Sequence, residues 1–95
     1  MIVGALTLRA VFREARSLKD KRHVLKSFTD RVRNKFNVAV AEVDDADEWQ
    51  SADLGVTTVA NDSRFVNSVL SGVLDFARGC PGMELVDHQI EIFNC

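Results

Sequence analysis

The sequence predicts an α+β sandwich, in which two helices cover one face of a four-stranded antiparallel sheet. Three observations predict it. The chain has only 95 residues, its hydrophobic periodicity alternates between that of strands and that of helices, and the elements follow one another in the order βαββαβ. Because so short a chain does not divide into two domains, we expect residues 1–95 to fold as one unit.

The first strand and the first helix are the most strongly patterned elements. Apolar side chains alternate from Ile2 to Phe12, which predicts a strand with one buried face. Ser17 and Asp20 resemble a helix-capping box, and apolar residues then recur at helical spacing. This pattern predicts a helix over residues 18–35.

Two strands on either side of an acidic turn follow. Asn37 interrupts the helical pattern, and residues 38–43 read as the second strand. Residues 44–48 are nearly all acidic and predict a turn. Residues 54–60, rich in valine and threonine, predict the third strand.

The last two elements are a helix and a strand. Asn61 or Asp62 can cap the helix, whose apolar positions continue to Gly79. Pro81 and Gly82 then stop it, and residues 83–93 predict the last strand.

This element order is that of the ferredoxin-like, or split βαβ, sandwich. Right-handed crossovers place the first and third strands centrally, in the strand order 4-1-3-2, with both helices on one face. In this arrangement the opposite sheet face has no helices. The alternative is an open α+β sheet with another strand order.

Composition excludes several classes of protein. No stretch has the roughly 18 to 20 apolar residues of a membrane span, and no leader segment is recognisable, so we expect a soluble cytoplasmic protein without a membrane partner. Cys80 and Cys95 form no CxxC pair and are read as ordinary thiols. We expect no metal, no cofactor and no small-molecule substrate.

Charge is segregated along the chain. Residues 1–35 hold ten Lys/Arg against three acids, a net charge of +7, whereas residues 36–95 hold two Arg against eleven acids, a net charge of −9. The overall charge of −2 therefore hides two fields of opposite sign.

Several segments resemble the YlxP-like family of small bacterial proteins. The most specific is Arg16-Ser-Leu-Lys-Asp-Lys-Arg22, and residues 36–44, 49–50 and 54–62 also match. The resemblance implies a ferredoxin-like fold in a bacterial cytosolic protein. Some family members are encoded beside transcription and translation factors, which implies an association with RNA or the ribosome. Phe12-Arg13-Glu14 departs from the family, in which a proline often follows the first strand.

Four cations of the first helix fall on one side of a helical wheel, beside its apolar stripe. Such a row is about 21 Å long at 1.5 Å per residue and can follow a phosphate backbone, with Arg16 just before it. The alternative is an ordinary solvated helix face. The hypothesis requires that the chain's own carboxylates do not shield the row. We call these residues the basic ridge: Lys19, Arg22, Lys26 and Arg33.

Lys21 falls instead within the apolar arc of this helix. A lysine there either snorkels to water, which is the commoner case, or pairs with a carboxylate, for which Glu42 is the best placed. Arg13, Arg16 and Lys19 are expected to approach the acidic turn at residues 44–48 and to neutralise it. Those cations, and the missing glycine of a calcium loop, disfavour a metal site in the turn.

The free sheet face is the second candidate surface. Its expected residues are small or apolar and include no aromatic side chain, so base stacking is disfavoured and self-association is favoured. The candidate interface residues are Val3, Ala5, Thr7, Arg9, Thr57 and Val59.

Catalysis is disfavoured, because the turn after the first strand lacks the phosphate-cradling glycine of an acylphosphatase. His23 points to solvent, and His88 falls on the buried parity of the last strand without a nucleophile nearby. The sequence therefore predicts a non-catalytic binding protein that contacts RNA or a ribosomal particle through the basic ridge. The alternative is a protein-interaction module that forms a homodimer, or binds an acidic protein, through the free sheet face.

Overall fold

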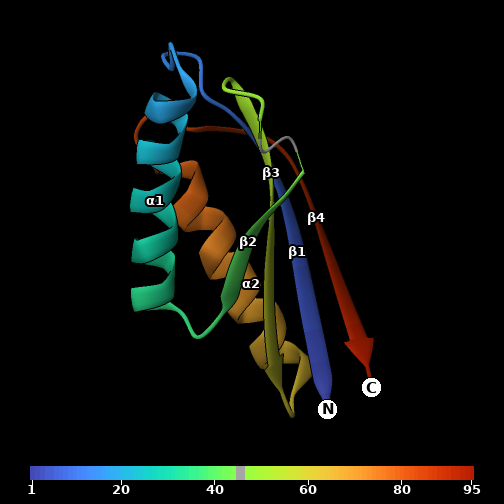
Figure 1. Cartoon of the computed structure of the whole chain (residues 1–95). Helices are drawn as coiled ribbons and strands as arrows, with labels where there is room; N and C mark the ends of the chain where they lie inside the picture. The colour runs from blue at the N-terminus through green and yellow to red at the C-terminus, as the bar shows by residue number, and fades with distance from the viewer. Residues whose placement is uncertain (45–46) are drawn as a thin grey trace.

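The computed structural model describes residues 1–44 and 47–95 and confirms the expected fold (Figure 1). All strand pairs are antiparallel, in the order β2-β3-β1-β4, and both helices lie on one side of the sheet. Asp45, in the acidic turn, lies outside the described residues. The elements are β1 (Ile2–Val11), α1 (Leu18–Lys35), β2 (Ala39–Asp44), β3 (Ser51–Ala60), α2 (Ser63–Arg78) and β4 (Glu84–Asn94).

Helix α1 begins where the capping pattern predicts. The Asp20 backbone N–H donates to Ser17 Oγ at 3.1 Å, and the Arg16 N–H donates to Asp20 Oδ2 at 2.9 Å. These bonds satisfy backbone donors that have no partner within the helix. The apolar stripe of α1 then lies in the core through Leu25, Phe28 and Val32.

Strand β3 begins at Ser51, earlier than the expected start at residue 54. Ala52 is buried opposite Ala10, and Asp53, which hides the strand pattern in the sequence, lies on the free face beside Arg9. A charged residue is accommodated there because the alternation of a strand points it away from the core.

Helix α2 lies very close to β1, at Gly4. A Cβ atom built at this position would lie 2.3 Å from Val66 Cγ1 and 2.8 Å from Leu70 Cδ1. Glycine therefore lets the helix approach the strand backbone. Among the described residues, no helix is long and apolar enough to cross a membrane.

We predict that Gly4→Ala lowers the free energy of unfolding by about 1–3 kcal/mol, because the new methyl group overpacks the α2–β1 contact. Urea unfolding followed through the fluorescence of Trp49, the single tryptophan of the chain, measures the change. Gly79→Ala is the matched control, since a Cβ there would meet only the Phe76 carbonyl at 3.8 Å. Equal stability of the two variants would contradict the close contact.

Candidate functional site

The basic ridge lies on the flank of α1 that is next to β2. All four of its side chains are exposed, and Arg16 is exposed just before the helix begins. The apolar stripe of α1 beside it, with Leu25 and Phe28, is buried in the core. The ridge is therefore accessible to solvent along most of the helix.

The chain's own carboxylates contact part of this ridge, so the condition that it be unshielded is met only in part. Arg22 Nη1 lies 3.3 Å from Glu42 Oε1, and Lys26 Nζ lies 2.8 Å from Asp30 Oδ2. Arg33 Nη2 instead donates to a neutral acceptor, the Val40 carbonyl, at 2.8 Å. Within the described residues, two of the four cations are thus paired with a carboxylate.

Lys21 is the most deeply buried charged residue that the structure describes. Its side chain is 0% exposed, and its Nζ lies 2.9 Å from Glu42 Oε2. Nζ also donates to the Ser51 carbonyl at 2.9 Å and to the Glu48 carbonyl. Pairing with Glu42 is confirmed, and the snorkelling interpretation is wrong. Lys21 therefore joins the first turn of α1 to β2 at Glu42, to the β2–β3 turn at Glu48 and to the start of β3 at Ser51.

Glu42 is consequently shared between two cations. Its Oε2 faces the buried Lys21, and its Oε1 faces the exposed Arg22. Lys21 is shut off from solvent, so Arg22 is the exposed cation of this cluster.

The Lys26–Asp30 pair is of a different kind. The two residues are one helical turn apart, and their side chains are 78% and 52% exposed. Exposed pairs at this spacing contribute only about 0.3–0.5 kcal/mol. A stronger anion can therefore displace Asp30 from Lys26 at little cost.

A shallow groove of about 460 Å³ runs between α1 and β2. Three ridge cations line it, Arg22, Lys26 and Arg33, together with the carboxylates of Asp30 and Glu42. Leu25 and Leu54 provide apolar lining, and both are buried. The groove thus combines charged side chains of both signs with apolar ones.

The sequence analysis placed Arg13 against the acidic turn, but in the structure Arg13 pairs with Glu84. Its Nε donates to Glu84 Oε2 on β4. This contact raises the pKa of the Arg13 guanidinium and lowers the pKa of the Glu84 carboxyl, in each case through the hydrogen bond first and the charge second. Among the described residues, no group of three His, Cys, Asp or Glu side chains is arranged to hold a metal ion.

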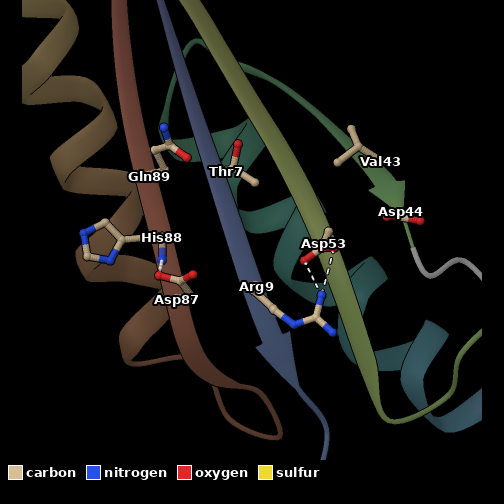
Figure 2. A pocket seen from close by; sticks show the side chains of 8 residues that line it. All are labelled: Thr7, Arg9, Val43, Asp44, Asp53, Asp87, His88 and Gln89. Carbon is tan, nitrogen blue, oxygen red and sulfur yellow. Dashed lines mark hydrogen bonds and ion pairs between the residues drawn. The ribbon is translucent and has the colours of Figure 1, made fainter.

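The free sheet face is acidic at one end, where it holds a second shallow hollow of about 460 Å³ (Figure 2). Arg9 Nη1 lies 2.9 Å from both carboxylate oxygens of Asp53. Arg9 is therefore engaged within the chain. The His88 side chain points away from this hollow and is exposed, because β4 is an edge strand. The residues that line the hollow are Thr7, Arg9, Val43, Asp44, Asp53, Asp87, His88 and Gln89.

The other end of the same face is apolar. Val3 is in register with Val59 on one side and with Phe93 on the other, so the three side chains form a row across β3, β1 and β4. Val59 is 57% exposed and Phe93 is 45% exposed. Phe93 corrects the expectation that this face has no aromatic residue. Ala5, Thr7 and Thr57 lie between the two ends.

Known proteins resemble this chain in sequence and in fold. Residues 3–90 match the model of a family described as protein of unknown function, DUF503. The chain is 34% identical over 92 residues to the uncharacterized protein YlxP of Bacillus subtilis (strain 168), with 97% of this chain and 100% of that protein covered.

Two solved structures with a similar fold are designed proteins. The designed protein Foldit4 aligns with a TM-score of 0.57 at 12% identity, covering 100% of this chain and 99% of its own. The designed LFR1 1, with a ferredoxin fold, also aligns with a TM-score of 0.57, at 10% identity, covering 98% of this chain and 84% of its own. At such low identity these matches show the fold alone.

We predict that Lys21→Met lowers the free energy of unfolding by about 3 kcal/mol or more, because it leaves Glu42 and two backbone carbonyls without their buried donor. Adding Glu42→Gln should recover part of the loss by removing the uncompensated charge. Denaturant unfolding measures both variants. Lys26→Met, which breaks an exposed pair, is the control, and a loss for Lys21→Met no larger than that of the control would refute the buried interaction.

Proposed function

The chain belongs to the DUF503 family, and from this premise we propose that it is a non-catalytic RNA-binding protein that associates with a ribosomal particle or another structured RNA. The basic ridge, with Arg16, contacts the phosphates. The bases are not stacked upon, since the ridge has no aromatic side chain.

The observation that carries this proposal is the row of exposed cations along α1. All four ridge residues are exposed, and they extend from the first turn of the helix to its last. Within the described part of the chain, Arg33 donates to a neutral acceptor, the Val40 carbonyl. Neutralising several phosphates releases their condensed counterions, which drives binding.

The rest of the molecule favours approach from the α1 side. Among the residues that the structure describes, the free sheet face carries Asp53, Asp87 and Glu91 against the single cation Arg9, which is bonded to Asp53, so its field repels phosphate. A molecule with cations on one side and acids on the other meets a polyanion in one orientation. Positioning of this kind comes from phosphate contacts, and specificity then comes from the shape of the RNA or from a protein partner.

We predict that replacing Lys19, Arg22, Lys26 and Arg33 by Gln abolishes binding to an RNA hairpin and comigration with ribosomal particles at low salt. For the unmodified chain, four phosphate contacts give a slope of about −3 to −4 in a plot of log affinity against log salt. Fluorescence anisotropy of a labelled hairpin over a salt series measures the slope. Circular dichroism checks that the variant is folded.

Two controls make this test specific. Arg64→Gln with Arg78→Gln removes two exposed cations from α2 and should leave the affinity nearly unchanged. Asp30→Asn frees Lys26 from its carboxylate and should strengthen binding. Undiminished RNA binding by the quadruple variant, or a flat salt response, would rule out the ridge as the contact surface.

Self-association through the free sheet face is a second candidate, favoured by the apolar row of Val3, Val59 and Phe93. Exposed rows of large apolar residues usually mark an interface. A two-fold dimer centred on this row keeps the acidic ends of the two faces apart.

For this candidate, we predict that Val59→Lys shifts the chain to the monomer in sedimentation velocity. Val43→Lys, at the acidic end of the face and similarly exposed (61% against 57%), should leave the dimer intact. The dimer should persist at high salt, since apolar contact drives it. A chain that is monomeric at high protein concentration would exclude this candidate.

A further inference from the structure

The two edges of the sheet are protected to different degrees. β2 is six residues long, and Arg33 occupies the Val40 carbonyl at this edge. β4 is eleven residues long and, among the described strands, pairs with β1 alone. It contains neither lysine nor proline, which most often guard an exposed edge, and its charged residues are three acids. The β4 edge is therefore open.

The backbone groups that β4 presents outward follow from the ladder. The Cys95 N–H donates to the Met1 carbonyl at 2.8 Å, and the Met1 amino group donates to the Cys95 carbonyl at 3.1 Å. Because bonded pairs alternate in an antiparallel ladder, Phe93 and every second residue before it turn their peptide groups toward β1. The peptide groups of Ile92 and Ile90 consequently point outward.

One outward donor is already engaged. The His88 N–H donates to the Asp87 carboxylate of its own strand at 2.9 Å. The outward groups that remain at the middle of the edge belong to Ile90 and Ile92. Exposed apolar side chains flank them, since Ile92 is 39% exposed on the helix side and Phe93 is 45% exposed on the free face.

The charge of this edge is negative throughout. Its charged side chains are Glu84, Asp87 and Glu91. Glu84 pairs with Arg13, whereas Asp87 and Glu91 accept hydrogen bonds from neutral donors, the His88 N–H and Gln89 Nε2. These acids belong to the acidic part of the sequence, which makes no contact with RNA in the proposal above.

From the open edge and its charge we infer that β4 binds an extended, lysine- or arginine-rich segment of another protein. The segment adds as a strand beside β4, bonds to the outward peptide groups of Ile90 and Ile92, and places its cations against Asp87 and Glu91. Strand addition of this kind takes its affinity from the backbone and its specificity from alternate side chains. A second copy of this chain is a poor occupant, because its own β4 would bring the same carboxylates.

The probe is an end-blocked eleven-residue peptide of alternating lysine and valine, with the glutamate–valine peptide as its control. Titration calorimetry should show saturable binding of the lysine peptide only. In the unmodified chain, its addition should slow hydrogen exchange at the Ile90 and Ile92 amides, while amides already bonded to β1 change little. This exchange pattern tests the mode of binding without any substitution.

Substitutions separate backbone pairing from charge. Ile92→Pro removes an outward N–H that the β1 ladder does not use, and should weaken binding about tenfold, whereas Ile92→Val should not. Asp87→Asn with Glu91→Gln should also weaken binding about tenfold, and Asn keeps an acceptor for the His88 N–H. Asp75→Asn with Glu14→Gln removes as much charge elsewhere and is the control. The quadruple ridge variant should bind the peptide normally, which separates this inference from RNA binding.

Equal affinity for both peptides would overturn the inference, because binding would not depend on the charge of the peptide. Unchanged binding by Ile92→Pro would also overturn it, because the peptide would not pair with the β4 backbone. A dimer that Ile92→Pro dissociates and the lysine peptide does not would also overturn it, by showing that a second copy occupies the edge.

Discussion

The buried charge of Lys21 is the constraint on which the candidate site depends. A fully buried ammonium requires acceptors around it, and Glu42, Glu48 and Ser51 supply them from β2, the β2–β3 turn and the start of β3. These contacts hold β2 against α1. They also fix the Glu42 carboxylate beside the exposed Arg22, so one buried interaction shapes both the fold and the charged surface.

The sequence predicted the architecture well because periodicity and capping are local signals. The Ser17–Asp20 pattern located the start of α1, and the alternation of β1 located the core face. Its errors arose where tertiary contacts decide. Asp53 hid the start of β3 because its partner, Arg9, is distant in sequence, and Phe93 was missed because the free face was assigned without β4. The i,i+4 spacing of Lys26 and Asp30 was visible in the sequence and signals a pair. The burial of Lys21 depends on how closely the β2–β3 turn approaches, which no local pattern encodes.

The charge asymmetry of the sequence becomes an asymmetry in space. The cations of the first third gather on α1, which covers the β2 side of the sheet, and the acids of the last strand line the opposite edge (Figure 1). Separating the two signs costs little stability, since exposed pairs contribute little. A chain of only 95 residues thereby has two surfaces of opposite charge.

The position of β1 also bears on synthesis of the chain. This strand emerges first, yet it lies at the middle of the sheet, and its ladder with β4 joins Ile2 to Asn94. Contacts between residues so distant in sequence form late, because the long intervening loop must close first. During translation the nascent chain therefore presents β1 with one side unpaired until β4 has left the exit tunnel.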